Sequence, residues 1–489
     1  MIKLNSKENP VEKYFNKLTP YHYYHFLILF LSKIPIFWHI LNLIFLSPPM
    51  EYVCKGSNIK NTCPCEEPVW NRSVFTQTTQ TKHGIYCEKT WLISFSQSML
   101  YVGTMVGSLA FGFLSDRFGR LSMFCLSCLI LATFGCLVSL SPSIETFIII
   151  RCFEGFGLGG CIVTSYVLVV EFCGPKHREV VSSLYHIPIN MGHISLAGVS
   201  YLLSDCDKFQ LAISIPVFLF VIMYWICLES PKWLLDKHDV DKTVRVMEKI
   251  GHFNKSPTDT IRNEIEEYIA SKTEQVVKRD KFLHIFRHKK LTRNFFCLTV
   301  VYFVCGMGYY GVSQYIGMMS GDIHANVAIS GALLIPATIA AVFLLKILER
   351  RTLLIATNTL SGLFMCILVF VPNQLSLLRI LFACICNCFF FITLIVVFLF
   401  GVELFPTSIR NSVLGVLSVL CRLGQIVAPF INSASELTSG LIFGIMALIA
   451  GVLCYPLPET KGVNLPSSLE DSKRISLDDN RNRNVTIND

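Results

Sequence analysis

The chain has 489 residues, of which 52% are hydrophobic and only 16% are charged, and its formal net charge is +8. A soluble domain carries roughly 25% charged residues, so this chain has too little charge to cover a water-facing surface. The same composition excludes a collagen, a disordered chain, a coiled coil and a small disulfide scaffold, and it indicates a polytopic membrane protein. In such a protein a positive charge is typical of cytoplasmic loops, so no nucleic-acid partner is expected.

Twelve hydrophobic runs are long enough to cross a bilayer. A membrane helix needs about 20 mostly apolar residues, because a rise of ~1.5 Å per residue has to cover ~30 Å of hydrocarbon. The first run follows a short polar segment without a small-residue cleavage site, so it is interpreted as a retained span and not as a signal peptide. The predicted spans are 24–46, 93–115, 121–141, 145–170, 180–203, 208–228, 294–317, 324–346, 352–371, 376–401, 411–432 and 436–456.

Two long polar segments interrupt these runs and set the expected orientation. Residues 229–293 contain fifteen Lys or Arg, and basic residues near span ends favour the cytoplasm. Residues 48–91 are then extracellular, where the sequon Asn71-Arg72-Ser73 can be glycosylated and cysteines can oxidise. The four cysteines of this loop allow three pairings, among which the sequence does not choose: Cys54, Cys63, Cys65 and Cys87.

An internal repeat divides the chain into two halves. Glu171 ends the fourth span and Glu403 ends the tenth, and each is followed by a proline and, seven positions later, by an arginine, Arg178 or Arg410. Transporters are commonly built from such related halves, with the ligand near the bilayer midplane between them. The predicted organisation is a cytoplasmic N-terminus (1–23), a six-helix half (24–228), a cytoplasmic linker (229–293), a second six-helix half (294–456) and a cytoplasmic tail (457–489), in the plasma membrane.

Several short motifs stand at or near span ends. They are Gly112–Arg120, Glu229–Leu234, Leu196–Tyr201, Glu403–Thr407 with Ile409–Asn411, and Pro458–Gly462. In these motifs the chain resembles the major facilitator superfamily and, within it, the organic anion, organic cation and carnitine transporters of solute carrier family 22. This resemblance implies an all-α membrane protein with twelve transmembrane helices in two six-helix halves around a central cavity. One departure is Lys346–Arg351, which stands where an Asp-Arg-x-Gly-Arg-Arg loop is usual.

Charged residues recur at the cytoplasmic span ends of both halves. Paired charges at such places can hold a closed state together and separate when the halves rock. The alternative is that they only anchor span ends at the lipid headgroups. The proposed cytoplasmic gate consists of Asp116, Arg117, Arg120, Glu171 and Arg178 in one half and Glu403 and Arg410 in the other, with Glu349 and Arg350 nearby.

Arg422 is the leading candidate for substrate binding. It follows Arg410 by 12 residues, so a straight helix places it about 18 Å deep, near the middle of the membrane. A buried Arg should face a hydrated cavity and bind an anion through its fork, unless an acid on another span, such as Glu154, pairs with it.

The resemblance sharpens the expected substrate class. It implies that the position of Arg422 is usually basic in carriers of organic anions or carnitine and acidic in carriers of organic cations. The segment Leu334-Ile335-Pro336 lacks a carboxylate typical of cation carriers, and Thr338 replaces a lysine typical of anion carriers. We therefore expect a transporter of organic anions or of zwitterions such as carnitine. An organic cation transporter of the same family and a non-transporting ligand sensor remain the alternatives.

Aromatic side chains complete the predicted substrate site. Tyr309 and Tyr310 lie among Gly306, Gly308 and Gly311, where a helix can break and bring rings to a cavity. Such rings can stack on flat ligands or hold a quaternary ammonium group. Further candidates are Trp38 and Tyr201, and secondary ones are Arg151 and Glu154. For Arg151 the alternatives are orienting helix packing and facing lipid headgroups.

No enzyme motif accompanies these features. There is no HExxH, GxSxG or P-loop lysine, so we expect no catalytic residue and no cofactor, and transport would depend on a gradient or a co- or counter-transported ion. Cys384, Cys386 and Cys388 alternate on a helix and point apart, which excludes a metal site by spacing. Gly155, Gly157 and Gly160 match GxGxxG inside a span, where close helix packing is the better interpretation; Gly103 and Gly107 predict a similar seam.

Overall fold

The computed structural model describes residues 9–55, 59–257, 260–272, 282–406 and 409–461, and the polar tail after Lys461 lies outside this range. The first half contains α2 (Pro20–Leu41), α3 (Leu43–Leu46), α5 (Trp91–Phe118), α6 (Arg120–Ser139), α7 (Ile144–Glu171), α8 (Pro175–Leu184), α9 (Ile187–Leu202), α10 (Cys206–Phe218), a 3-10 turn (Leu219–Ile222) and α11 (Met223–Ile226). The second half contains α15 (Lys289–Met318), α16 (Ile323–Ile347), α17 (Arg350–Phe370), α18 (Ser376–Leu404), α19 (Arg410–Asn432) and α20 (Glu436–Cys454).

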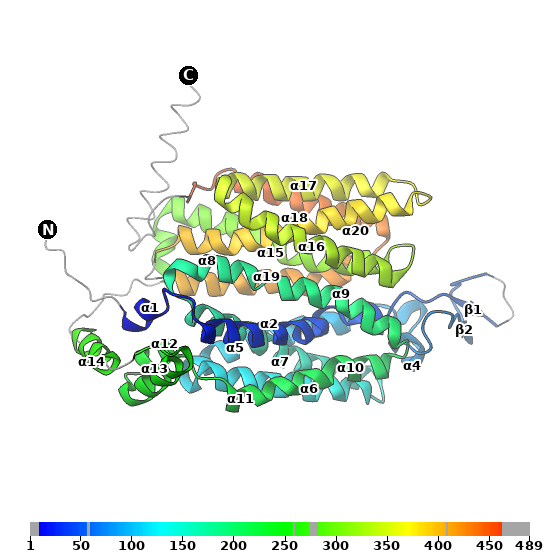
Figure 1. Ribbon diagram of the computed structural model, residues 1–489. Coiled ribbons are helices and arrows are strands. Elements are labelled where there is room, and N and C mark those ends of the chain that lie inside the picture. The colour runs from blue at the N-terminus through cyan, green and yellow to red at the C-terminus, as the bar shows by residue number, and fades with distance from the viewer. Residues whose placement is uncertain (1–8, 56–58, 258–259, 273–281, 407–408, 462–489) are drawn as a thin grey trace, which may run out of the picture.

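Eleven helices of the described residues are long and apolar enough to cross a membrane, and they match eleven of the twelve predicted spans. The exception is the fifth, predicted as one helix over 180–203. It consists of α8 and α9, which follow one another through the bundle (Figure 1). Pro188 explains the break, because proline disfavours helical backbone at the residue before it and lacks an amide donor, so it is tolerated only in the first turn of α9.

A second difference concerns the glycines around the tyrosine pair. α15 continues without interruption through Gly306, Gly308 and Gly311, so the expected helix break is absent from this described segment. A Cβ at Gly306 would collide with the carbonyl oxygen of Cys421, and one at Gly308 with the ring of Phe390. These glycines therefore let α19 and α18 pack closely against α15, which fixes the tyrosines on an unbroken helix.

Helix packing repeats between the halves. In the first half α5 packs on α7, α6 on α7 and α10, and α2 on α9 and α10. In the second, α16 packs on α18, α17 on α18 and α20, and α15 on α19 and α20, which is the same set for six duplicated spans. Across the halves, α9 packs on α16 and α5 on α19. Figure 1 shows the two groups one above the other.

Close approaches of α5 and α7 confirm the two predicted packing seams. A Cβ at Gly103 or Gly107 would collide with backbone oxygens of Cys152 or Phe156 on α7. A Cβ at Gly155 would collide in the same way with Leu100 on α5. The GxGxxG pattern is therefore a helix-packing feature.

The bundle has two distinct ends (Figure 1). At the terminal end lie both ends of the described chain, together with four short helices: α1 (Pro10–Tyr14), α12 (Pro231–Asp236), α13 (Val240–Asn254) and α14 (Ile261–Lys272). At the opposite, loop end lie α4 (Thr79–His83) and a hairpin in which β1 (Tyr52–Cys54) pairs antiparallel with β2 (Pro68–Trp70), Val53 opposite Val69. Two disulfides, Cys54–Cys65 and Cys63–Cys87, cross-link this loop, and Asn71 directly after β2 is exposed.

Candidate functional site

At the terminal end of the first half, four charged residues form one cluster. Arg120 Nε donates to Glu171 Oε1 (3.0 Å), and Arg120 also pairs with Asp116. Glu229, just before α12, accepts from the backbone amides of Arg120 (2.9 Å) and Leu121 (3.0 Å), so it caps the N-terminus of α6. Gly119 makes room for this cap, because it has a φ of 108° and a Cβ there would collide with Glu229. The cluster ties the ends of α5, α6, α7 and α12 together.

The second half repeats this arrangement in a different sequence. Arg350 Nε lies 3.5 Å from Glu403 Oε1. This pair corresponds to the Arg120–Glu171 pair of the first half. Glu459 accepts from the backbone amides of Arg350 (2.9 Å) and Arg351 (3.0 Å) and so caps α17. The unusual loop around Glu349 therefore keeps both the ion pair and the helix cap.

Three of the predicted gate residues lie outside these pairs. Arg178 contacts Glu12 of α1 (2.9 Å), which also contacts Lys232 (3.2 Å). Burial raises the pKa of the Glu12 carboxyl, but these two cations outweigh it and the pKa is lowered. Arg117 is exposed beside the ring of Phe118, and Arg410 Nε donates to the Phe405 carbonyl (3.1 Å). Part of the Glu403–Arg410 motif, at 407–408, lies outside the described residues.

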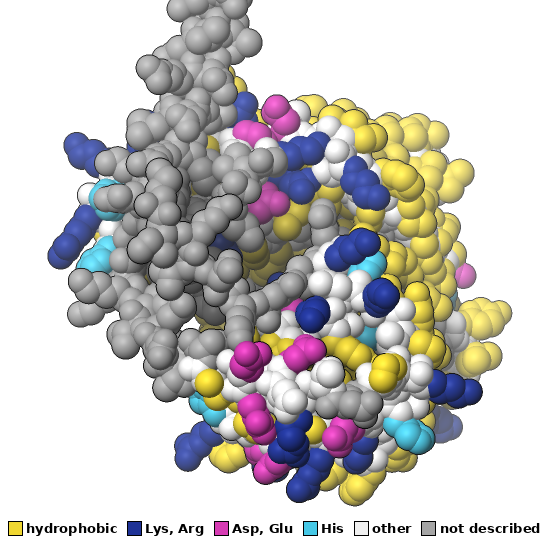
Figure 2. All heavy atoms as spheres, turned by 60° about the vertical axis from the view of Figure 1, so that its left-hand side comes forward, with side chains coloured by type: hydrophobic (Ala, Val, Ile, Leu, Met, Phe, Trp, Pro, Cys, Tyr) yellow, Lys and Arg dark blue, Asp and Glu magenta, His cyan; other side chains and the backbone are white. Residues whose placement is uncertain are grey.

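At the terminal end, the pairs Arg120–Asp116, Arg120–Glu171 and Arg350–Glu403 each lie within one half, and Glu12 of α1 pairs with Arg178 of α8 and Lys232 of α12. Figure 2 shows charged side chains on both halves at this end, with hydrophobic side chains recessed between them. Contacts between the halves lie elsewhere, for example from Ser98 Oγ to the Ile426 carbonyl (2.7 Å) and from Asn190 Nδ2 to Thr338 Oγ1 (2.8 Å). The clusters thus stiffen each half in this state.

In the middle of the bundle, eight side chains from both halves lie near one another, and they are here called the central cluster. Tyr309 contacts Tyr310 and Phe391, with ring centroids 4.8 and 5.2 Å apart, and Phe391 contacts His186 at the α8–α9 break (5.9 Å). Tyr310 also contacts Tyr101 of α5 (6.1 Å). The members are Lys33, Tyr101, Tyr185, His186, Tyr309, Tyr310, Phe391 and Arg422.

Two cations complete the central cluster, one from each half. Arg422 of α19 donates to Gln425 (2.9 Å) and interacts with Tyr310. Lys33 of α2 is 4% exposed, its ammonium lies 4.3 Å above the ring of Tyr185, and it interacts electrostatically with Arg422 and His186. No carboxylate within the described part of the chain forms an ion pair with Lys33 or Arg422. An anion between them would be attracted by both.

Sequence reasoning did not include Lys33 in the substrate site. A signal was present, because Lys33 follows Pro20 by 13 residues, which places it about 20 Å along α2, close to the depth of Arg422 along α19. Which sides of α2 and α19 point toward the middle of the bundle could not be inferred from either segment alone.

Two other predicted ligand residues lie apart from the central cluster. Tyr201 is 72% exposed at the loop end of α9, with its edge on His324. This position does not fit substrate binding in the central cluster. Trp38 donates from Nε1 to Ser195 Oγ (2.9 Å) and so joins α2 to α9 within the first half.

The secondary candidates, Arg151 and Glu154, form a buried polar network that sequence reasoning did not predict. Arg151 Nη1 lies 3.8 Å from Glu154 Oε2, and both side chains are fully buried. Glu154 Oε1 also accepts from Gln210 Nε2 (3.0 Å) and contacts His39 Nδ1 (2.7 Å). Glu154 is therefore engaged inside the first half and is not the partner of Arg422, and Arg151 does not face lipid headgroups.

Comparisons with known proteins agree with this architecture. A family model described as "Sugar (and other) transporter" matches residues 65–469. Solute carrier family 22 member 1 of Bos taurus is 30% identical over 444 residues, which cover 90% of this chain and 78% of that protein. The organic cation transporter protein of Drosophila melanogaster is 30% identical over 433 residues, with 86% and 78% covered. The inward-open xylose transporter XylE from E. coli has a TM-score of 0.68 at 17% identity, covering 93% of this chain and all of that one.

Proposed function

Because this chain belongs to the sugar (and other) transporter family of the major facilitator superfamily, and within it to solute carrier family 22, we propose that it carries small organic anions or zwitterions across the membrane by alternating access. The family consists of multi-pass membrane transporters and not of enzymes, as the sequence predicted. We further propose that the terminal end is cytoplasmic, that the protein acts in the plasma membrane, and that Asn71 at the loop end is glycosylated.

One observation carries the choice of substrate charge: Lys33 and Arg422 come from opposite halves and interact electrostatically, and neither forms an ion pair with a carboxylate among the described residues. Two like charges in a poorly solvated site repel, and a bound carboxylate relieves that repulsion while its oxygens accept hydrogen bonds from Arg422. The rings of Tyr101, Tyr310 and Phe391 suit a flat organic body attached to the carboxylate.

The arrangement of contacts supports alternating access. The halves meet through contacts such as Ser98–Ile426 and Asn190–Thr338, while the Arg120–Glu171 and Arg350–Glu403 pairs each lie within one half, as expected for two units that move against one another. Rocking of two rigid halves about a midplane site is the general mechanism of such carriers.

A second candidate substrate class is organic cations, because one relative is named an organic cation transporter. Cation–π contacts to the tyrosines of the central cluster are the feature that would serve such a ligand. The two buried cations weigh against it.

Uptake into proteoliposomes that contain the purified protein tests the proposal. The panel is a dicarboxylate, p-aminohippurate, carnitine and tetraethylammonium, each radiolabelled. We expect saturable uptake of p-aminohippurate, the dicarboxylate or carnitine, and little uptake of tetraethylammonium. Binding without uptake would favour a ligand sensor, and preferred uptake of tetraethylammonium would favour the cation carrier.

A further inference from the structure

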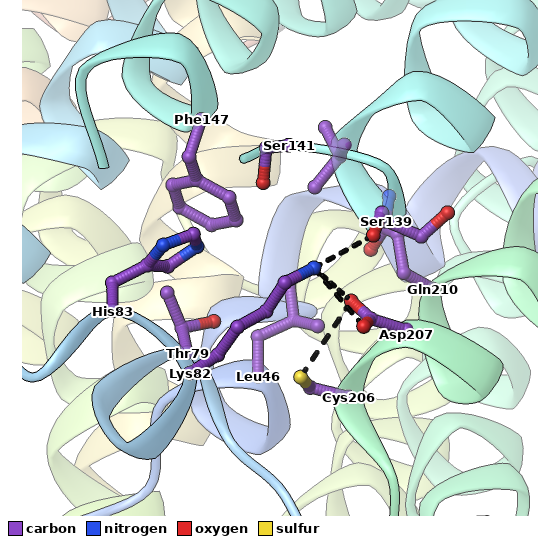
Figure 3. Close-up of a pocket in the computed structure, with 11 residues that line it drawn as sticks. Leu46, Thr79, Lys82, His83, Ser139, Ser141, Phe147, Cys206, Asp207 and Gln210 are labelled. Atoms are coloured by element: carbon purple, nitrogen blue, oxygen red, sulfur yellow. Dashed lines mark hydrogen bonds and ion pairs between the residues drawn. The ribbon is translucent and has the colours of Figure 1, made fainter. Parts of the chain in front are cut away.

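Two cavities of very different size lie at opposite ends of the molecule, both away from the central cluster. The one at the loop end has a volume of about 10 Å³, close to what one water molecule occupies (Figure 3). Its lysine is already paired, because Lys82 donates to Asp207 (2.8 Å) and to the Ser139 carbonyl (2.8 Å). The one at the terminal end has a volume of about 380 Å³, which is within the usual range of small-molecule sites.

The larger cavity, here called the terminal cavity, lies between the segment 10–19, which contains α1, and the helices α13 and α14 (Figure 1). Its floor is apolar. Met247, Ile261 and Ile265 line it and are at most 9% exposed. Burial of apolar surface against such a floor stabilises an organic molecule, whereas an inorganic ion gains nothing from it.

The polar side chains of the terminal cavity include donors without partners. The buried hydroxyl of Tyr14 has no hydrogen-bond partner within the described residues. Lys17 forms no ion pair with a carboxylate in the described part of the chain. Lys13 lies 3.8 Å from Glu264, so one of the two lysines is already balanced. The described residues that line the cavity therefore have one positive charge in excess, which favours an anion.

The helix α1 connects the terminal cavity with the broken fifth span. Glu12 of α1 pairs with Arg178 of α8 (2.9 Å). Phe15, directly after α1, is fully buried and stacks on Phe172, with ring centroids 5.7 Å apart. α8 leads to the break at His186, a member of the central cluster. A molecule in the terminal cavity therefore contacts the helix that holds one end of α8.

We propose that the terminal cavity is a second ligand site, separate from the central cluster, which binds a small organic monoanion. The carboxylate or sulfonate of the ligand accepts hydrogen bonds from Lys17 and Tyr14, and its apolar body packs on Met247 and Ile265. By contacting α1, the bound anion steadies the end of α8. The site does not depend on the transport proposed above, because none of its residues belongs to the central cluster.

Photolabelling of the purified full-length protein with 4-azidobenzoate, an aromatic monoanion that cross-links on illumination, tests the site. We expect label on the peptides that contain α1 and the start of α14, identified by mass spectrometry. Lys17→Glu should lower this labelling by roughly tenfold, because it replaces an attraction with a repulsion. Lys249→Glu is the matched control and should keep the label, since Lys249 is an exposed residue of α13 outside the described lining of the cavity. Unlabelled peptides in the wild type, or undiminished label in Lys17→Glu, would overturn the proposal.

A second measurement separates the terminal cavity from the central cluster. In Arg422→Ala the label on α1 and α14 should stay within about twofold of wild type. In this variant, 4-azidobenzoate kept in the dark should also raise the midpoint of thermal unfolding, since a ligand that binds only the folded protein stabilises it, and adding Lys17→Glu should abolish the rise. Both results stand even if the protein transports no anion. Loss of the label in Arg422→Ala, or a midpoint that 4-azidobenzoate does not raise, would contradict a second site.

Discussion

At the terminal end, Arg120 and Arg350 have equivalent neighbours, although the loops that carry them differ in sequence. Each pairs with the acid that ends a neighbouring span, Glu171 or Glu403. Each also starts a helix whose first amides are capped by a glutamate from the end of the same half, Glu229 or Glu459.

Even the backbone contacts of the two loops correspond. Trp233 Nε1 donates to the carbonyl of Asp116 (2.9 Å), and Lys461 Nζ donates to the carbonyl of Lys346 (2.7 Å), which stands at the equivalent position. A carbonyl is present whatever the side chain, so this contact survives the change from aspartate to lysine.

The two halves have equivalent contacts at the terminal end, but their buried arginines have different surroundings. Arg151 is fully buried with Glu154, His39, Asn42 and Gln97, whereas its counterpart Arg379 pairs with Glu436, whose side chain is 43% exposed. The repeated contacts at the terminal end therefore form a structural frame common to both halves, and the buried charges that are not repeated are available for functions specific to one half. Four predictions test this division.

The largest effect is expected from the two cations of the central cluster. Arg422→Ala and Lys33→Ala should each lower p-aminohippurate uptake by roughly 30-fold or more, because losing one partner of a desolvated charge pair costs about 2–5 kcal/mol. Uptake at saturation and at low concentration, corrected for the amount of reconstituted protein, provides the measurement. Wild-type uptake in Lys33→Ala would show that the site is confined to the second half.

Equal, smaller effects are expected at the terminal end of the two halves. Arg120→Ala and Arg350→Ala should each reduce the maximal rate by about fivefold, since each change removes roughly 1 kcal/mol of clustered ion-pair stabilisation from a moving half. The KM should change by less than about twofold, because neither residue contacts the ligand. A loss in Arg120→Ala alone would show that the two clusters are not functionally equivalent.

The helix caps should contribute equally to stability. Glu229→Ala and Glu459→Ala should each cost about 0.5–2 kcal/mol, as expected for a lost helix N-cap. Thermal unfolding in detergent reports this as a lowered midpoint, with Glu248→Ala, an exposed glutamate of α13, as control. An unchanged midpoint for Glu459→Ala would mean that the second cap is dispensable.

The smallest effect is expected at Tyr201. Tyr201→Ala should leave the uptake of every substrate within about twofold of wild type, because a ring that is 72% exposed at the loop end, outside the central cluster, contributes little. A substrate-dependent loss would return Tyr201 to the binding site.

Much of the frame is predictable from sequence, because span length and hydropathy follow directly from the thickness of the bilayer. The paired acids and arginines were also predictable, because they recur at equivalent span ends of the two halves. The break at Tyr185–His186 was missed because Pro188 alone does not say whether a helix bends, starts or continues.

The central cluster was predictable only in part. Arg422, Tyr309 and Tyr310 could be found from depth and composition, but Lys33 needed the facing of α2 toward α19, which depends on tertiary packing. The Arg151–Glu154 network contains residues of α2, α5, α7 and α10. A local sequence pattern does not predict which polar residues of four separate helices contact one another.

The central claim is that the charge of the central cluster sets the charge of the substrate. Its most direct test is the ratio of p-aminohippurate to tetraethylammonium uptake in the wild type and in Arg422→Asp, measured in the same proteoliposome preparation. The wild type should prefer the anion by at least about tenfold, and Arg422→Asp should lower the ratio by roughly 100-fold, since reversing a buried charge changes the interaction by several kcal/mol. An unchanged ratio in Arg422→Asp, or a wild type that prefers tetraethylammonium, would contradict the claim.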